Sequence, residues 1–446
     1  MNNSKVGIRK WLSFILAGFV GQIAWAIENN YLNLYVFDCT SQYNFIPIMT
    51  ACSAAAATLT TLLMGAVSDR IGKRKSLISF GYIIWGVSII LFAFLDPGST
   101  LSFVNGSVMM SGVMIVVMDC VMTFFGSTAN DAAFNAFVTD NTNERNRGKV
   151  ESVLSVFPLI SMILVVLVGG FLVEDKSNTH WDIFFYIFGG ITIISGIICI
   201  FLLPKDIKGP NKEENYFQNV IHGFKPSVIK NNKILYIVLA AFMVFSIGIQ
   251  CFMPYFMVYV QQALNIKEMD FTITLGVVLL SASIITVVVG AFMDKIGKNR
   301  LIFPALGLNI LGGIIMFFVR EKVGVMIGGT ILMSGYLLGT AVLGAKIRDY
   351  TPTKETGLFQ GVRMIFAVLI PMVTGPYIGL GVSNINAVTY TNEYGIEVTR
   401  PNEYIFLFTS IVLLLTFIPV IFMLIEEKKA KLVTQEVKEE NNETTI

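Results

Sequence analysis

The chain has 446 residues, of which 54% are hydrophobic and only 14% are charged. Soluble globular proteins carry about 25% charged residues, so this composition excludes an ordinary soluble enzyme. The formal net charge of +2 gives no general attraction to nucleic acid, and we expect no nucleic-acid partner. The mean hydropathy of +0.69 favours a lipid bilayer as the surroundings of the chain.

Long apolar stretches recur along the whole sequence. A helix needs about 20 apolar residues to cross a hydrocarbon core of about 30 Å. Because lipid offers no hydrogen-bond partners, each such stretch must satisfy its own backbone as a helix. We therefore predict an all-α membrane protein with twelve transmembrane helices. The predicted spans are 11–36, 44–68, 76–95, 105–130, 152–173, 183–203, 233–262, 271–293, 301–319, 323–345, 358–380 and 404–425.

The positions of the lysines and arginines predict the orientation. If both termini lie inside the cell, the outer segments hold only Lys176, Lys267, Arg320, Lys322 and Arg400 of the 32 basic residues. Arg363 lies near the inner end of the eleventh span, and all the others lie in inner segments. Basic residues are enriched in cytoplasmic loops. We expect a multi-pass protein of the cell membrane with cytoplasmic termini.

The first span has a second interpretation. A basic start, an apolar run and the sequence Ala24-Trp25-Ala26 are also typical of a cleavable signal peptide. Cleavage would leave eleven spans and would remove the counterpart of the seventh span in the repeat described next. We therefore predict that the first span is retained.

One motif occurs twice, about half a chain apart. The loop after the second span carries Gly65, Asp69, Arg70, Gly72, Lys73 and Arg74, and the loop after the eighth carries Gly290, Asp294, Lys295, Gly297 and Lys298. The spacing is the same in both copies. A second echo relates Asp140, Thr142 and Gly148 to Asp349, Thr351 and Gly357. Such repeats predict two pseudo-symmetric six-helix bundles, 1–203 and 233–425, with a cytoplasmic linker at 204–232 and a polar cytoplasmic tail at 426–446 that frays.

The doubled loop motif resembles the major facilitator superfamily over residues 7–425. More narrowly, the segment from Asn130-Asp131 to Asp140, followed by Glu144 to Lys149, is similar to the region between helices 4 and 5 of sugar–cation symporters. The sucrose–proton branch and the glycoside–pentoside–hexuronide–cation branch both show such a region. The segment from Phe359 to Met364, with Pro371 after it, indicates the same group. Melibiose-type carriers have carboxylates on the second helix, whereas this chain has none there.

The resemblance implies roles for the motif residues. Glycine permits the close approach of another helix, as we expect at Gly65 and Gly290. A carboxylate is stabilised near a helix N-terminus. The family pattern places Asp69 beside the start of the eleventh helix, near 357–360, and Asp294 beside the start of the fifth, near 148–152. We expect these contacts to hold an inner gate closed; the basic residues of the motif also set topology and contact lipid phosphates.

Polar side chains within the spans mark candidate sites. An aspartate at the centre of a membrane helix costs about 2.5–3.5 kcal/mol, so Asp119 needs a functional reason. Thr123 and Ser127 extend a polar strip from it. The first span carries two stripes, and its spacing does not decide which one faces a cavity. One stripe holds Gln22, Asn29 and Asn33, and the other holds Glu28, Tyr31 and Tyr35.

The seventh span contains further candidates. Gln250, Pro254, Met257 and Gln261 share one face, and Tyr255 and Tyr259 share another. Proline in a helix interior breaks or bends it, so we predict an interruption at Pro254. Amides in membrane helices also join helices to each other, and tyrosines also lie at membrane interfaces, so packing is the competing role.

These patterns favour secondary active transport. The sequence has no phosphate-binding loop, no HExxH motif, no CxxC pair and no histidine within a span, so we expect no enzyme activity, no metal and no cofactor. We predict symport of a small solute, a sugar or glycoside, with a proton or sodium ion, by a chain that functions as a monomer. Asp119 and Glu28 are the leading candidates for coupling. Export of drugs or metabolites by proton antiport, and sensing without transport, are the alternatives.

Overall fold

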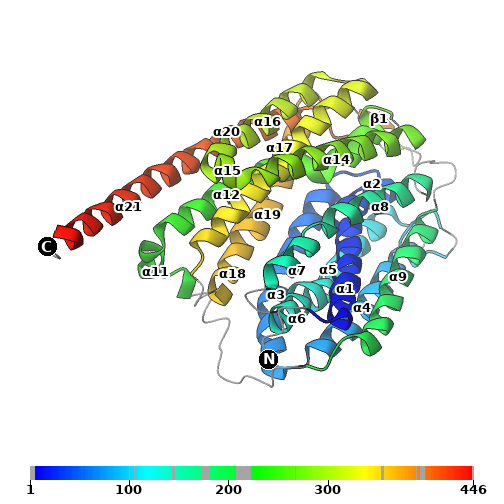
Figure 1. The fold of residues 1–446 in the computed structure, drawn as a ribbon. Coiled ribbons are helices and arrows are strands. Elements are labelled where there is room, and N and C mark those ends of the chain that lie inside the picture. Colours follow the sequence, from blue (N-terminus) through cyan, green and yellow to red (C-terminus); the bar gives the residue numbers. More distant parts are fainter. Residues whose placement is uncertain are drawn as a thin grey trace.

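The computed structural model describes residues 6–99, 101–104, 106–142, 146–172, 180–206, 222–266, 268–352, 356–387, 389–391 and 397–443. Over these residues the chain is helical apart from one short hairpin (Figure 1). Eleven of the described helical spans are long and apolar enough to cross a membrane. The remaining predicted span corresponds to α8, a shorter apolar helix that follows α7 after one turn. The prediction of an all-α membrane fold is confirmed.

The first half of the chain forms one helical bundle, coloured blue to green in Figure 1. The short helices η1, η2 and η3 interrupt or extend longer α-helices in this half. Its elements are α1 (Ile8–Ala26), η1 (Ile27–Tyr31), α2 (Leu32–Thr40), α3 (Phe45–Ile71), α4 (Arg74–Leu91), η2 (Phe92–Phe94), α5 (Val108–Gly126), η3 (Ser127–Phe134), α6 (Asn135–Asn141), α7 (Arg147–Leu154), α8 (Phe157–Leu172) and α9 (Trp181–Leu202).

The second half forms the other bundle, coloured green to red. Its elements are α11 (Pro226–Asn231), α12 (Lys233–Phe252), η4 (Met253–Tyr255), α13 (Phe256–Val258), η5 (Tyr259–Ala263), α14 (Glu268–Ala291), α15 (Met293–Ile296), α16 (Lys298–Phe318), α17 (Lys322–Tyr350), α18 (Thr356–Met364), η7 (Ile365–Leu369), α19 (Ile370–Ser383), β1 (Thr389–Thr391), β2 (Glu397–Thr399), α20 (Tyr404–Leu415) and α21 (Phe417–Glu443). The strands β1 and β2 pair antiparallel, with Tyr390 opposite Val398.

Several element boundaries differ from the sequence predictions. The first span continues to Thr40, and a short helix, α11, lies within the predicted linker. The tail that was expected to fray continues α21 as far as Glu443, because its residues are mostly good helix formers. Much of the predicted linker, residues 207–221, lies outside the described residues, so its exact limits stay a prediction.

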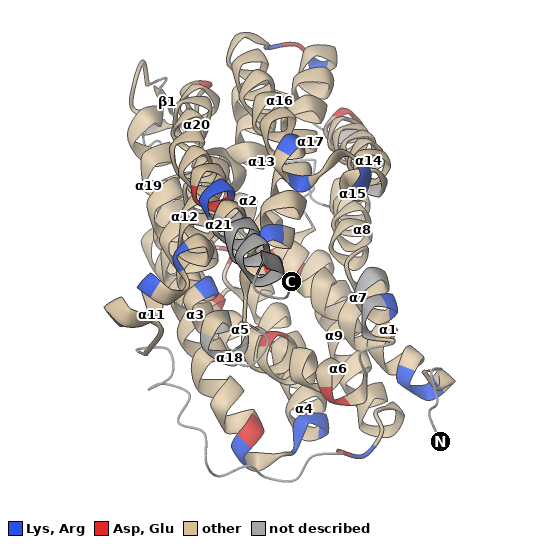
Figure 2. Cartoon of the chain, turned by 60° about the vertical axis from the view of Figure 1, so that its left-hand side comes forward, with Lys and Arg blue, Asp and Glu red and all other residues tan. Residues whose placement is uncertain are grey.

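Charged residues lie mainly at the helix ends (Figure 2). We call the end that carries Arg9, Arg70, Lys73, Lys298 and Arg348 the basic face, and the end that carries the hairpin the opposite face. Apolar helix bodies connect the two, as a hydrocarbon layer requires.

The two bundles meet along a few helices. The helices α8 and α14 contact each other across this interface, as do α3 and α19. On the side of the opposite face, the Tyr43 hydroxyl donates a hydrogen bond to Asn384 Oδ1 over 2.7 Å. At the basic face, a Cβ atom added to Gly290 would meet no atom within 4 Å. The expected close approach of a helix at Gly290 is therefore not seen among the described residues of this conformation.

The helices lose regular α geometry at a small number of places. The Pro254 segment is 3₁₀-helical and ends α12, which confirms the predicted interruption. In the part of the chain that the structure describes, four segments, η1, η3, η5 and η7, are π-helical. Turns of this kind are rare and often lie at functional sites. They lie in the spans predicted first, fourth, seventh and eleventh.

A buried ion pair fixes α21 to its bundle. Lys346 on α17 and Glu427 on α21 form an ion pair, and their side chains are only 4% and 7% exposed. Glu427 also accepts hydrogen bonds from Tyr350 Oη at 2.8 Å and from Asn299 Nδ2 at 2.7 Å. Each carboxylate oxygen therefore has a donor. A charge buried in this way stays stable only while its partners remain in place.

We expect Glu427→Gln to lower the thermal unfolding midpoint of the purified protein strongly. Removal of one partner of a buried ion pair costs about 3–5 kcal/mol, because the other charge is left without compensation. Glu426→Gln is the matched control, since the neighbouring Glu426 pairs with the exposed Lys233 and Lys429. Equal midpoints for the two variants would show that the Lys346 pair does not stabilise the fold.

Candidate functional site

A small cavity lies between the two bundles. The first bundle contributes most of its lining, and the second closes it with residues of the seventh and eleventh spans. Its lining residues are Glu28, Asn29, Asn33, Met49, Thr50, Ser53, Asp119, Gln250, Pro254 and Met372. The cavity therefore depends on elements that are far apart in the sequence. Five of its lining residues, Asp119, Glu28, Asn29, Asn33 and Gln250, were predicted site residues.

The Glu28 carboxylate is anchored by two hydroxyl groups. Ser53 Oγ and Thr123 Oγ1 each donate a hydrogen bond to Glu28 Oε1, both over 2.8 Å. The two hydroxyl oxygens are also 2.9 Å apart. All three side chains are buried. Three helices, the first, second and fourth spans, thus meet at a single carboxylate oxygen.

Other oxygen atoms of this region have no hydrogen-bond partner in the described structure. They are Glu28 Oε2, Asp119 Oδ1 and Asn33 Oδ1, and all are buried. Buried polar atoms without partners are costly, so they indicate a role beyond packing. Two carboxylates with hydroxyl and amide oxygens around them can share a proton or coordinate a monovalent cation. Among the described residues, no group of three or more His, Cys, Asp or Glu side chains could hold a metal ion.

The π-helical turn η1 explains why spacing alone did not choose between the two stripes of the first span. In a π-helix the backbone hydrogen bonds join residues five apart, so a turn holds more residues than an α-helical turn and shifts the face of the residues that follow; Glu28 and Asn33 both line the cavity. Members of both stripes consequently line the cavity. Tyr31 and Tyr35 instead pack inside the first bundle, where their hydroxyls donate to the carbonyls of Val166 and Phe92 at 3.3 and 2.6 Å.

The remaining predicted residues lie outside the cavity lining. Gln22 is half-buried and does not line it. The Tyr255 hydroxyl donates to the Pro376 carbonyl at 2.7 Å, and Tyr259 packs edge-on against Phe406. In this conformation both tyrosines contact neighbouring residues of the second bundle. Their assignment as substrate residues stays a prediction.

Sequence reasoning missed the contribution of the second span. Thr50 and Ser53 lie on α3 and line the cavity, yet this span has no charged residue to attract attention. Their spacing of three residues on an apolar helix was the available signal, because it places two hydroxyls on one face. Met49 and Met372 were missed because methionine in a membrane helix has no distinctive pattern.

The cavity is narrow in this conformation. It offers about 20 Å³ of space to water, which corresponds to one or two water molecules. A solute the size of a sugar needs several hundred Å³. This cavity by itself is therefore too small to hold such a solute in this conformation.

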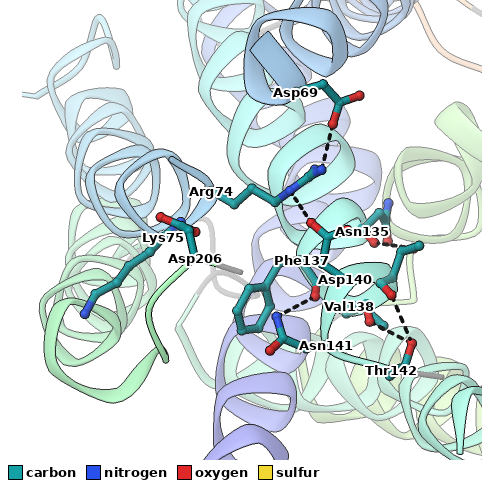
Figure 3. Close-up of polar contacts among 11 residues, drawn as sticks. Asp69, Arg74, Lys75, Asn135, Phe137, Val138, Asp140, Asn141, Thr142 and Asp206 are labelled. Atoms are coloured by element: carbon teal, nitrogen blue, oxygen red, sulfur yellow. Dashed lines mark hydrogen bonds and ion pairs between the residues drawn. The ribbon is translucent and has the colours of Figure 1, made fainter. Parts of the chain in front are cut away.

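At the basic face, the first motif copy forms an ion network (Figure 3). Arg74 donates through Nη2 to Asp69 Oδ1 over 2.7 Å and through Nε to Asp140 Oδ2 over 2.6 Å. The Arg74 and Asp140 side chains are only 9% and 5% exposed. The guanidinium group thus connects the second, third and fourth spans of the first bundle.

The end of α6 is fixed by its own side chains. Asn141 Nδ2 donates to the Phe137 carbonyl over 3.0 Å, and Thr142 Oγ1 donates to the Val138 carbonyl over 2.8 Å (Figure 3). These bonds satisfy carbonyl groups that a helix end leaves free. They hold the Asp140 backbone in position beside Arg74.

The second motif copy shows a corresponding pair. Lys298 Nζ contacts Asp349 Oδ1 and Oδ2 at 2.8 and 2.6 Å. This pair repeats the contact between the third and fourth spans of the first bundle. Gly72 and Gly297 have positive φ angles of 67° and 90°, which glycine adopts without strain. They allow the chain to turn sharply between the helices of each motif.

The predicted gate contact of Asp69 is not tested by these positions. In this conformation Asp69 is bound by Arg74. Residues 353–355 and several side chains at the start of α18 lie outside the described part of the chain, as does the Asp294 side chain. The gate contacts of both aspartates therefore stay predictions.

Two bundles of membrane helices around a shared polar cavity define a transporter fold. The sequence profile of the Major Facilitator Superfamily matches residues 11–340. The chain therefore belongs to the Major Facilitator Superfamily, and it is a membrane transporter rather than an enzyme. A search of curated proteins found no match.

Solved structures show the same fold at low sequence identity. A D-xylose–proton symporter is 15% identical, with a TM-score of 0.68, and the match covers 93% of this chain and 97% of that one. The nucleoside transporter NupG is 12% identical, with a TM-score of 0.66 and coverage of 94% and 99%. An inward-facing bacterial homologue of the human lysosomal transporter Spinster is 12% identical, with a TM-score of 0.64 and coverage of 94% and 98%.

We expect Arg74→Gln to destabilise the first bundle by about 1.5–3 kcal/mol, the usual contribution of a hydrogen bond to a charged group. The reason is that the buried Asp140 loses its guanidinium partner. Thermal unfolding of the purified protein measures the loss. Arg70→Gln is the control, because Arg70 is exposed on the same face. If both variants unfold at the wild-type temperature, the network does not contribute to stability.

Proposed function

We propose that the protein moves a small polar solute, a sugar or glycoside, in symport with a proton or sodium ion by alternating access. The observation that carries this proposal is the pair of buried carboxylates, Glu28 and Asp119, in a cavity that both bundles line. The surroundings of a cation-binding group in this position change whenever the distance between the two bundles changes. Its occupancy can therefore be coupled to the conformation of the protein.

The polar side chains of the cavity support a hydroxylated solute. Asn29 from the first bundle and Gln250 from the second both line the cavity, and Thr50 and Asn33 add further polar groups. Amide side chains can both donate and accept hydrogen bonds, as the hydroxyl groups of a sugar require. The similar folds of a D-xylose–proton symporter and a nucleoside transporter agree with such a substrate.

The Glu28 environment supports cation coupling. Its Oε1 atom is held by Ser53 and Thr123, while its Oε2 atom and Asp119 Oδ1 have no described partner. One oxygen of the Glu28 carboxylate is thus fixed by hydrogen bonds, and the other can bind a cation. A proton binds a single oxygen, whereas sodium needs several oxygen ligands, and the cavity offers both possibilities.

Orientation follows from charge. We place the basic face in the cytoplasm, because cytoplasmic loops are enriched in lysine and arginine. Both termini then lie inside the cell. We further propose that one chain is sufficient for transport, since the cavity is formed by the two bundles of the same chain.

We expect Asp119→Asn to abolish gradient-driven accumulation of substrate and to leave exchange down the substrate's own gradient measurable. Asparagine keeps the shape of the side chain but cannot gain and lose a proton or neutralise a sodium ion. Proteoliposomes with an imposed proton or sodium gradient provide the measurement, and the gradient that drives uptake identifies the ion. Asp182→Asn, at the start of α9 and outside the cavity, is the control. Accumulation by Asp119→Asn at the wild-type rate would exclude Asp119 as the coupling group.

A counterflow screen tests the substrate class. We expect radiolabelled sugars or glycosides to exchange across the membrane of proteoliposomes that contain the protein. We expect Gln250→Leu to raise the half-saturation concentration for exchange about tenfold, because the variant loses a hydrogen bond worth roughly 1.4 kcal/mol. Exchange of amphipathic drugs with no exchange of sugars would favour the exporter alternative. The absence of counterflow with every solute, by a correctly folded protein, would favour a sensor.

A further inference from the structure

An apolar groove runs along the outer surface of the first bundle, away from the cavity between the bundles. Its volume is about 340 Å³. The inner end of α3, the first half of α4 and the junction of α5 with η3 form its walls. Its lining residues include Lys73, Ser76, Phe80, Gly81, Ile84 and Phe124.

The absence of a side chain at Gly81 brings two helices together at this groove. A Cβ atom added there would lie 2.6 Å from Ala129 Cβ, so α4 and η3 cross in close contact. Larger side chains stand around this crossing, and Phe80, Ile84 and Phe124 remain exposed. The result is an elongated apolar hollow whose walls are exposed on the lipid side of the helices.

The length of the groove matches one membrane leaflet. Lys73 and Ile84 mark its two ends along α4, eleven residues apart. At 1.5 Å per residue this distance is about 16 Å. Half of a hydrocarbon core of about 30 Å is about 15 Å. The groove therefore extends from the basic face to roughly the middle of the bilayer.

The charge at its end is positive. Lys73 is exposed, and no carboxylate among the described residues bonds to it. The adjacent Arg74 is already bound by Asp69 and Asp140. Lys73 also precedes the N-terminus of α4, whose partial positive charge favours anions. Ser76, one turn further on, adds an exposed hydroxyl group.

We propose that the groove binds an anionic phospholipid of the leaflet at the basic face. One acyl chain lies along the apolar walls, and the phosphate pairs with Lys73 and accepts a hydrogen bond from Ser76. The charge selects an anionic headgroup, and the length selects a chain that ends near the bilayer centre. The bound headgroup would lie beside the Asp69–Arg74–Asp140 network.

Native mass spectrometry of the full chain tests the proposal. The protein is released from micelles that contain phosphatidylglycerol and phosphatidylcholine in equal amounts, and the lipids that remain bound are counted. We expect the wild type to retain phosphatidylglycerol in preference to phosphatidylcholine. Lys73→Gln should weaken this retention about fivefold, the effect of one basic residue near an anionic membrane surface. Lys230→Gln, an exposed lysine on α11, is the matched control and should retain the wild-type amount.

A second variant tests the acyl-chain part. Ile84→Trp fills the deep end of the groove and should reduce phosphatidylglycerol retention at unchanged Lys73, whereas Ile194→Trp, on the lipid-exposed side of α9, should not. Equal retention of both lipids by the wild type, or wild-type retention by Lys73→Gln, overturns the pairing of the headgroup. Wild-type retention by Ile84→Trp overturns the assignment of the groove.

Discussion

The fold depends on one constraint: hydrocarbon offers no hydrogen-bond partner to the peptide backbone. Every segment that crosses the membrane must therefore satisfy its own N–H and C=O groups, and the helix does so within a single segment. This requirement produces the apolar helices that make up both bundles. Irregular backbone is tolerated in such a protein where it lies against other protein or water instead of lipid. The π-helical turn η1 and the 3₁₀ segment at Pro254 fit this rule, since both border the cavity between the bundles.

The same constraint gives the buried carboxylates their significance. A charged side chain in the apolar interior is expensive, so its presence calls for partners or for a function. Glu28 has both, because two hydroxyls bind one of its oxygens while the other oxygen has no described partner. Asp119 lines the same cavity, and its Oδ1 atom also has no described hydrogen-bond partner. The residues that line the opposite wall come from the second bundle and carry no charge. Relative motion of the bundles would thus change the surroundings of the carboxylates without moving the groups that anchor them.

The two bundles share a plan and differ in detail. Each has a basic residue after its motif glycine that pairs with an aspartate at the end of its fourth helix: Arg74 with Asp140, and Lys298 with Asp349. The first pair is buried and also binds Asp69, whereas the second is more exposed. In the second bundle the buried contact is the pair between Lys346 and Glu427, which fixes the last helix. Duplication thus preserved the loops at the basic face, while the polar interior of the first bundle and the ion pairs of the two bundles diverged.

Local patterns in the amino-acid sequence predict the approximate helical spans, the duplicated loop motif, the interruption at Pro254 and the candidacy of Asp119 and Glu28. These follow from local quantities, namely the length of apolar runs, spacing along one chain and the cost of a single buried charge. Which side chains meet depends on how the helices pack, and local patterns do not give it. In the folded chain, Ser53 from the second span donates a hydrogen bond to Glu28, and Asn33 lines the same cavity as Glu28 after a π-helical turn. Tyr255 and Tyr259 pack against residues of the second bundle. The reason is that an α-helical periodicity describes one face of one regular helix, whereas a site between helices depends on their irregular turns and on the way they pack.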